Sequence, residues 1–225
     1  MALNGIVIAV DGPAAAGKGT LARRLAAALR LPYLDTGLLY RAVGRRVLDA
    51  GADPRDAGIA EAAARALVPA DLDRADLRGP MADMAASAVA AIPAVRAALL
   101  DFQRDFGRAH GAVLDGRDIG TVVFPQAQAK LFVTASVAER SRRRFLELAG
   151  RGVAADPAQV EAEIRDRDAQ DANRPVAPLR PAEDAILIDT TTLDADAAFA
   201  EALRVVRARL AQPDRAATAA AKPCR

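Results

Sequence analysis

The sequence predicts an α/β fold with a parallel five-stranded sheet flanked by helices. Three observations predict it: short apolar runs recur along the 225 residues, segments with helical spacing separate these runs, and polar or glycine-rich residues follow each of them. The runs with strand character are 6–10, 33–34, 112–114, 130–133 and 185–188. Since parallel sheets bind ligands at the carboxyl ends of their strands, we expect the chemistry to gather at one edge of the sheet.

The first apolar run leads into a loop of small residues that contains one lysine, and a helical pattern begins near Thr20. This order is typical of a phosphate-binding loop, because small residues let backbone N–H groups turn towards phosphate oxygens. Lys18 adds a mobile positive charge, and the helix directs its positive end at the same anion. The pattern predicts a nucleoside triphosphate site built from Gly12, Pro13, Ala14, Ala15, Ala16, Gly17, Lys18, Gly19 and Thr20.

A second interpretation of this loop is a dinucleotide site, since residues 17–22 fit the pattern G-x-G-x-x-A and Asp35 ends the next apolar stretch. We reject it because a dinucleotide-binding loop turns at once from strand to helix, whereas Gly17 lies well beyond the first strand. The common phosphate-binding loop has Ser or Thr directly after its lysine, but here Gly19 follows and Thr20 comes one place later. The sequence therefore does not identify the ligands of Mg²⁺.

Two long segments between the strands predict a substrate-binding insertion and a lid. Residues 38–110 are too many for a simple crossover and carry helical patterns at 38–50, 55–67, 81–92 and 94–109, with Pro54, Pro80 and Pro93 near their starts. Residues 138–173 predict two charged helices joined near 150–152. We expect a single domain over 1–211, with the insertion at 38–110 and the lid at 138–175, and a disordered tail at 212–225.

Composition and charge restrict the class of protein. Apolar residues make up 52% of the chain, enough for a substantial core, and 31 basic against 29 acidic residues are too balanced to predict a nucleic-acid partner. The basic residues instead cluster at 140–151 and 165–180, which indicates a local anion site. The single cysteine, Cys224, excludes a disulfide framework. Because no segment resembles a signal peptide or a membrane span, we expect a cytoplasmic protein without a membrane partner.

Four segments together resemble the bacterial cytidylate kinase family. They are residues 11–20, residues 34–41, residues 115–125 (DGRDIGTVVFP) and residues 173–179 (NRPVAPL). The resemblance covers roughly residues 5–210, and 115–125 is its most specific part. It implies a P-loop kinase fold in a monomer that transfers the γ-phosphoryl group of ATP, with Mg²⁺, to CMP or dCMP. One departure is that residues 67–80 are too few for the small β-rich segment usual in the family's insertion.

The resemblance also implies catalytic roles for particular residues. Lys18 matches a position that holds the β- and γ-phosphates, and Arg167 matches a lid arginine that resembles a cis arginine finger. Arg117 and Arg174, like Arg41, match positions that contact the acceptor phosphate, where the paired donors of a guanidinium suit phosphate oxygens. Without the resemblance, an exposed ion-paired helix is an equal interpretation of Arg167 and Arg174.

The substrate contacts that the resemblance implies are Thr36, Arg41, Ser87, Arg96, Asp118 and Asp171. In the family, the positions of Ser87, Arg96 and Asp118 contact the base, and that of Asp171 lies near the sugar. A carboxylate accepts a hydrogen bond from the N4 amine of cytosine and repels the carbonyl that uracil has there. Two alternatives stay open: a small-molecule kinase for UMP, AMP or shikimate, and a protein that binds ATP without transferring phosphate.

Overall fold

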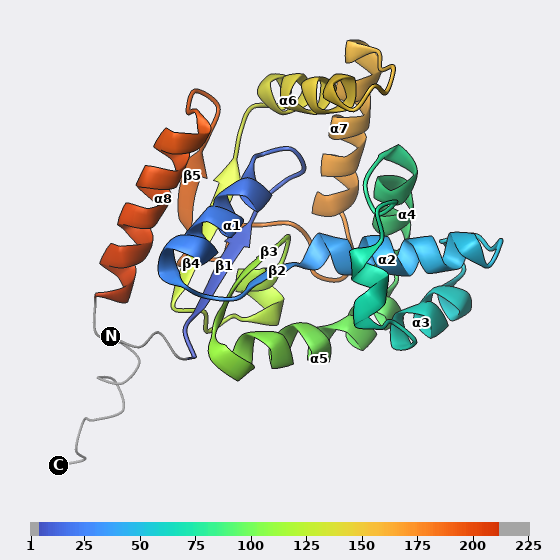
Figure 1. The fold of residues 1–225 in the computed structure, drawn as a ribbon, viewed down its shortest axis with the longest axis horizontal. Helices are drawn as coiled ribbons and strands as arrows, with labels where there is room; N and C mark the ends of the chain where they lie inside the picture. Colours follow the sequence, from blue (N-terminus) through green and yellow to red (C-terminus); the bar gives the residue numbers. More distant parts are fainter. Residues whose placement is uncertain (1–4, 212–225) are drawn as a thin grey trace.

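The computed structural model describes residues 5–211, and Figure 1 shows a central sheet with helices on both faces. Within these residues the sheet has five parallel strands in the order β2-β3-β1-β4-β5. The strands are β1 (Val7–Asp11), β2 (Tyr33–Asp35), β3 (Ala112–Gly116), β4 (Ala129–Thr134) and β5 (Ile186–Asp189). The predicted five-stranded parallel sheet is confirmed, because each strand coincides with one of the apolar runs.

Except for α1, which follows Gly17, the helices begin at a capping side chain or a proline. They are α1 (Lys18–Leu29), α2 (Thr36–Asp49), α3 (Ala57–Arg65), α4 (Pro80–Ala90), α5 (Pro93–His110), α6 (Val137–Gly150), α7 (Pro157–Ala172) and α8 (Ala195–Leu210). Pro80 and Pro93 occupy the first position of their helices, where the missing N–H costs no hydrogen bond. The helices predicted within 38–110 are confirmed as α2 to α5, while α1 begins at Lys18 rather than at Thr20.

Both faces of the sheet are covered, which explains why the strands read as continuous apolar runs. Successive strand residues point to opposite faces. Val7 and Ala9 of β1 therefore belong to a core shared with α2 to α5, while Ile8 and Val10 belong to a core shared with α1 and α8. This three-layer packing fixes the carboxyl ends of β1 and β3 side by side.

The insertion depends on a close approach between two helices. Gly44 of α2 faces α4, and a Cβ at Gly44 would lie 2.8 Å from the Cβ of Ala85. Residues 67–80, all described, contain a 3₁₀ helix at Pro69–Asp73 and no strand, as their length predicts. Glycine at position 44 therefore lets α4 lie against α2 beside the carboxyl end of the sheet (Figure 1).

The predicted pair of charged helices is present as α6 and α7, which lie beyond the carboxyl end of the sheet (Figure 1). Arg140 of α6 joins the two helices, since its Nη2 lies 2.6 Å from Oδ2 of Asp168 on α7. Arg140 Nη1 also donates to the carbonyl oxygen of Ala14, in the loop after β1, at 3.3 Å. The helix pair is thereby tied to the phosphate loop.

Two sequence expectations concern other parts of the chain. The tail predicted at 212–225, which includes Cys224, lies outside the described residues. In the described part of the chain, no single helix is long and apolar enough to cross a membrane. The consecutive helices α4 and α5 reach that length and apolarity only as a pair, and the chain bends by 98° between them.

Candidate active site

The loop that follows β1 has the backbone of an anion-binding turn. Gly12 has a φ of 151°, and a Cβ there would lie 2.0 Å from the carbonyl oxygen of Val133, so only glycine fits. Ala15 and Gly17 also have positive φ angles, of 58° and 85°. Such left-handed residues turn neighbouring N–H groups into one concave surface that suits an anion.

Lys18 opens α1, and its ammonium lies inside this loop. Its Nζ donates to the carbonyl oxygen of Pro13 at 3.3 Å and lies 3.9 Å from the carboxylate of Asp115, on β3. The hydroxyl of Tyr33 donates to the same carboxylate at 3.3 Å. Burial lowers the pKa of Lys18, and the positive charge of Arg117 lowers it further. A buried cation beside a second cation favours a bound anion.

Asp11, the last residue of β1, fixes the turn after β3. Its buried carboxylate accepts hydrogen bonds from the backbone N–H groups of Ile119 at 2.8 Å and Gly120 at 2.7 Å, in a π-helical turn at Ile119–Val123. Burial raises the pKa of Asp11 to about 7, although the two N–H groups oppose this rise. Sequence analysis assigns Asp11 no role of its own, and its place at a strand end is the only signal that marks it.

Asp171 gathers two of the predicted catalytic arginines. It lies near the end of α7, only 1% exposed, accepts from Nε of Arg117 at 2.8 Å and forms a second ion pair with Arg174. Burial would raise the pKa of Asp171, but the charges of Arg117 and Arg174 hold it below its ordinary value. The exposed-helix interpretation is wrong for Arg174, because its side chain is 9% exposed and its partner is buried.

Two of the residues predicted to contact the base form a pair. Arg96 of α5 and Asp118, just after β3, make a buried ion pair. The guanidinium of Arg96 also lies 5.7 Å from the ring centroid of Tyr40. Ser87 is half-buried on α4, outside this pair. Guanidinium donors and a carboxylate acceptor side by side complement the hydrogen-bonding edge of cytosine.

Arg41 meets a carboxylate that the sequence analysis did not predict. Its Nε donates to Asp83 of α4 at 2.9 Å, and its Nη1 lies 3.8 Å from Asp35. Asp83 also accepts from Nη2 of Arg144, on α6, at 2.6 Å and lies 3.8 Å from Nη1 of Arg167, on α7. The sequence marks Arg144 only as part of the basic cluster at 140–151 and does not mark Asp83, so only the fold reveals this group of charges.

Arg167 carries positive charge that its surroundings do not match. Its Nε is buried and has no hydrogen-bond partner among the described residues. Burial lowers the pKa of Arg167 to about 10, and the neighbouring charge of Arg117 adds to this effect. The positive charges of Arg117 and Arg167 both lower the pKa of Lys18. An anion bound among these three cations would relieve their repulsion.

A cleft of about 270 Å³ opens beside the phosphate loop. Its lining includes Gly17, Thr20, Arg143, Thr190 and Leu193. The guanidinium of Arg143 donates to the hydroxyl oxygen of Thr190 at 2.9 Å and to its carbonyl oxygen at 2.6 Å. Of these lining residues, sequence analysis predicts only Gly17 and Thr20. The cleft adjoins the predicted polyphosphate site and has both polar and apolar walls.

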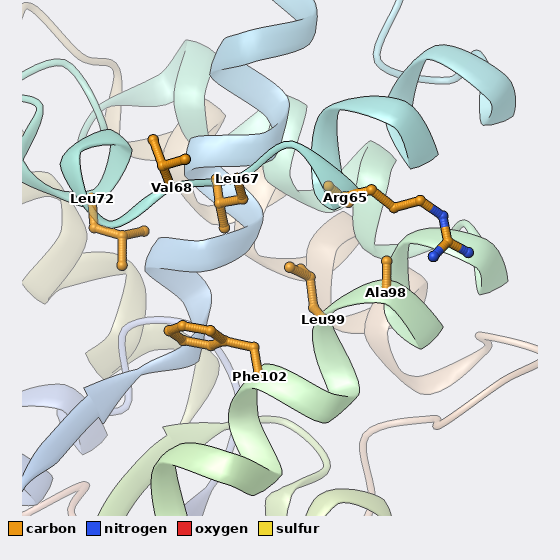
Figure 2. Close-up of a pocket in the computed structure, with 8 residues that line it drawn as sticks. Arg65, Leu67, Val68, Leu72, Ala98, Leu99 and Phe102 are labelled. Carbon is orange, nitrogen blue, oxygen red and sulfur yellow. The ribbon is translucent and has the colours of Figure 1, made fainter.

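A larger cleft, of about 310 Å³, lies away from these charges. Figure 2 shows its lining, which comes from α3, the segment after it and α5 and is mostly apolar. Its one charged side chain, Arg65, is paired with Glu61 at 2.7 Å. Because none of the predicted site residues lines this cleft, we place the candidate site at the carboxyl end of the sheet.

Thr36 and two strand-end carboxylates complete the site. The buried hydroxyl of Thr36 donates to the carbonyl oxygen of Asp115 at 2.7 Å, so it fastens the start of α2 to β3. Burial raises the pKa of Asp115, and the negative charge of Asp35 adds to this effect while Lys18 opposes it. The described residues hold no cluster of three or more metal-binding side chains. Two neighbouring carboxylates still fit Mg²⁺, which proteins often bind through one or two carboxylates and the phosphates of a nucleotide.

Comparison with known families identifies the relatives of this chain. A family model described as cytidylate kinase matches residues 8–208. The chain belongs to the cytidylate kinase family. The resemblance predicted from four segments is therefore confirmed over nearly the whole described chain.

Individual relatives agree with this membership of the cytidylate kinase family. The protein named cytidylate kinase from Granulibacter bethesdensis is 66% identical over 202 residues, which are 90% of this chain and 97% of that protein. The one from Acidiphilium cryptum is 61% identical over 207 residues, 92% and 98% of the two chains. A solved structure of an uncharacterized protein from Eubacterium ventriosum has a TM-score of 0.53 at 12% identity, covers 90% of this chain and 98% of its own, and bears on the fold alone.

Proposed function

We propose that this chain transfers the γ-phosphoryl group of ATP to CMP or dCMP, giving ADP and CDP or dCDP. The observation that carries the proposal is the positive charge of Lys18, Arg117 and Arg167, whose side chains are only 12%, 16% and 23% exposed, at the carboxyl end of the sheet. It lies near the Arg96–Asp118 pair, since Arg174 interacts with both Arg117 and Asp118. Membership of the cytidylate kinase family supports the same reaction.

The donor half of the site is the phosphate loop. Lys18 and the backbone N–H groups of residues 14–20 hold the β- and γ-phosphates, and the cleft lined by Thr20 and Leu193 receives the nucleoside. Asp35 and Asp115 would hold Mg²⁺ against these phosphates, directly or through water. The ion would supply charge neutralisation for the departing ADP.

The acceptor half is built from arginines and carboxylates. Arg41, Arg117 and Arg174 bind the phosphate of CMP, while Asp171 orients two of these arginines and lies near the sugar. An oxygen of the CMP phosphate attacks the γ-phosphorus of ATP, the bond between that phosphorus and the β–γ bridging oxygen breaks, and ADP leaves. The reaction needs no general base, because the acceptor phosphate is already ionised.

Arg167 contacts the γ-phosphoryl group while it is transferred from ATP to CMP. Its Nε is buried and unpartnered among the described residues, so it has a donor to offer to the migrating phosphoryl oxygens. A positioned arginine contributes about 10³–10⁵ in rate in other phosphoryl-transfer enzymes. Burial strengthens this contact, because the charge interacts in a medium of lower dielectric than water.

We further propose that the protein acts as a monomer in the cytoplasm. All the proposed site residues come from one chain, so a second copy is not needed to complete the site. The substrates are highly charged nucleotides that do not cross a bilayer unaided, which favours the cytoplasm as the compartment. Light scattering after size-exclusion chromatography tests the monomer, and a dimer mass would overturn it.

A coupled assay of ADP release tests the function across acceptors. With Mg²⁺-ATP, we expect kcat/KM for CMP or dCMP to exceed that for UMP, AMP and shikimate by at least about tenfold, since a site with committed polar partners rejects analogues. Faster turnover of UMP or AMP would contradict the proposed base selection. Tight ATP binding without CDP in the chromatographed products would instead favour the non-catalytic alternative.

A further inference from the structure

Asp83 is a half-buried carboxylate that the proposed reaction leaves without a role. Its side chain is 15% exposed, and it lies in the first turn of α4 among arginines from α2, α6 and α7. We propose that Asp83 is a positioning residue for phosphoryl transfer: it orients Arg41 and Arg167 towards the substrates and holds the lid against the insertion through Arg144. This inference rests on the proposed function.

The backbone of Asp83 is well placed for such a role. Its N–H donates to the carbonyl oxygen of Gly79 at 2.9 Å, as the first turn of α4 requires. Two residues later, Ala85 packs against Gly44 of α2 so closely that a Cβ at position 44 would lie 2.9 Å from the carbonyl carbon of Ala85. The distance between Asp83 and α2 is therefore fixed by backbone contact rather than by the flexible arginine side chains.

The carboxylate directs the donor groups of two site arginines. Asp83 accepts from Nε of Arg41 at 2.9 Å, and Nη1 of this guanidinium lies 3.8 Å from Asp35, which leaves Nη2 as a donor for the acceptor phosphate. It lies 3.8 Å from Nη1 of Arg167, whose buried Nε stays unpartnered among the described residues. Each guanidinium is thus held at one end and presents other donors to the site.

The charge of Asp83 persists at neutral pH. Burial would raise the pKa of Asp83, but the charges of Arg41, Arg167 and Arg144 hold it below its ordinary value. An ionised carboxylate also separates guanidinium groups that would otherwise repel one another. Their shared partner therefore lets two cations of the site stand close together before any nucleotide binds.

The same carboxylate joins the lid to the insertion. Nη2 of Arg144, on α6, donates to Asp83 at 2.6 Å. A second contact lies nearby, where Nη2 of Arg151 donates to the carbonyl oxygen of Arg78, just before α4. We infer that closing the lid and orienting Arg167 are one event, since both depend on the first turn of α4.

A competing account makes Asp83 an obstacle. In that account the carboxylate occupies arginines that the CMP phosphate needs, and its removal tightens CMP binding. The two accounts differ in sign: a positioning residue lowers kcat when it is neutralised, whereas a competitor lowers the KM for CMP and leaves or raises kcat.

Steady-state kinetics of Asp83→Asn separate these accounts. We expect kcat to fall about 10- to 100-fold, the range that follows from misplacing a reacting group by about 1 Å. The KM for ATP should stay within about twofold, because the side-chain hydrogen bonds and ion pairs of Asp83 within the described residues go to Arg41, Arg144 and Arg167, outside the phosphate loop. Asp83→Glu keeps the carboxylate and should restore kcat to within about fivefold of the native value. An unchanged kcat, or a lower KM for CMP at native kcat, would overturn the proposal.

Two further variants keep the test independent of folding. Asp49→Asn removes a carboxylate that also pairs with two arginines, Arg45 and Arg74, but lies at the far end of α2, so it should leave kcat unchanged.

Arg144→Gln should lower kcat, and the double variant with Asp83→Asn should be no slower than Asp83→Asn alone, since both act through one contact. Native kcat in Arg144→Gln sinks the proposal even where Asp83→Asn fails to fold. If the native protein forms no CDP, the proposed function itself fails and this inference with it.

Discussion

Single residues of the site carry charges that the protein does not fully neutralise. Lys18 and Arg167 lie half-buried near Arg117, and loss of water contact together with this like charge lowers the pKa of both. Their neighbours Arg117 and Arg174 share the carboxylate of Asp171. Since proteins seldom bury unmatched charge without a ligand, the residue-level electrostatics favour a polyanion at this position.

Asp118→Asn tests whether this residue selects the base. An asparagine can present its amide N–H₂ to the O4 carbonyl of uracil, whereas the carboxylate only accepts, as from the N4 amine of cytosine. We expect the ratio of kcat/KM for CMP to that for UMP to fall by about 5- to 150-fold, the equivalent of about 1–3 kcal/mol. Parallel coupled assays with the two nucleotides measure this ratio.

A loss of stability accompanies this substitution and must be kept apart from selectivity. Asp118 is the buried partner of Arg96, so its neutralisation leaves a guanidinium poorly paired. The assays therefore run well below the melting temperature of the variant, which calorimetry gives. A CMP to UMP ratio equal to that of the native protein would show that Asp118 does not contact the amine.

The candidate site residues that sequence motifs identify lie close together, because the carboxyl ends of parallel strands lie at the same edge of the sheet. The loop after β1 and the turn after β3 are both visible in the sequence as polar residues that follow apolar runs, which places Lys18, Arg117 and Asp118 at this edge of the sheet. The roles proposed for Arg117 and Asp118 come from the family resemblance. Asp83 could not be predicted, because it is one acid in an alanine-rich helix and its partners come from distant segments. Asp11 directly follows the first apolar run of the sequence, but its hydrogen bonds to the N–H groups of Ile119 and Gly120 could not be predicted without the fold.

At the scale of elements, the helices of the insertion could be predicted but their packing could not. Pro80 and Pro93 mark the starts of α4 and α5 in the sequence, because proline suits the first helical position. The sequence does not indicate that Gly44 faces Ala85, because a glycine within a helical pattern indicates only a low helix propensity at that position. The close approach of α2 and α4 is determined by tertiary packing and not by the local sequence of either helix.

Gly44→Ala tests that close approach. The added methyl group would lie 2.8 Å from the Cβ of Ala85 and 2.9 Å from its carbonyl carbon, so α4 must move away from α2. We expect a loss of about 1–3 kcal/mol in the free energy of unfolding, as for other overpacked helix contacts. Urea titration followed by circular dichroism measures it, and a shift of α4 should also raise the KM for CMP.

Gly58→Ala is the matched control in the same insertion. Its new Cβ would meet only the carboxylate oxygen of Asp56, at 3.5 Å, which is ordinary contact. Because alanine favours the helix by about 0.5–1 kcal/mol over glycine, this variant should be as stable as the native protein or more so. Equal stability of Gly44→Ala and the native protein would mean that the two helices separate at no cost.

At the scale of the whole molecule, α2 to α5 share an apolar core with the sheet, and ion pairs around the site add links that also include α6 and α7. Asp171 connects α7 to the turn after β3, Asp83 connects α4 to α6, and Arg140 connects α6 to the loop after β1. The basic clusters at 140–151 and 165–180 supply many of these links, so part of their charge is already paired within the protein and the predicted anion site there stays a prediction. Arg142 and Arg165, for example, pair with acids of their own helices at the surface.

Bound nucleotides should therefore stabilise the whole molecule against unfolding. The contribution of CMP and the contribution of ATP to this stabilisation should be separable. A ligand at 100 times its Kd adds about 2.7 kcal/mol to the free energy of unfolding, which raises Tm by about 5–11 °C in a domain of this size. We expect saturating CMP and a non-hydrolysable ATP analogue each to raise Tm, and both together to raise it further. Differential scanning calorimetry measures the shifts.

Lys18→Met tests whether the Tm shift with the ATP analogue arises at the phosphate loop and the Tm shift with CMP at the acceptor site. The substitution removes the ammonium from the phosphate loop but leaves Arg96, Asp118 and Asp171 in place, so the shift with CMP should persist while the shift with the ATP analogue falls. UMP at the same concentration should give a smaller shift than CMP, since uracil has no amine for Asp118 to accept from. A variant that keeps the full response to the ATP analogue would remove Lys18 from the donor site, because a cation that binds the β- and γ-phosphates cannot be replaced by a thioether without loss.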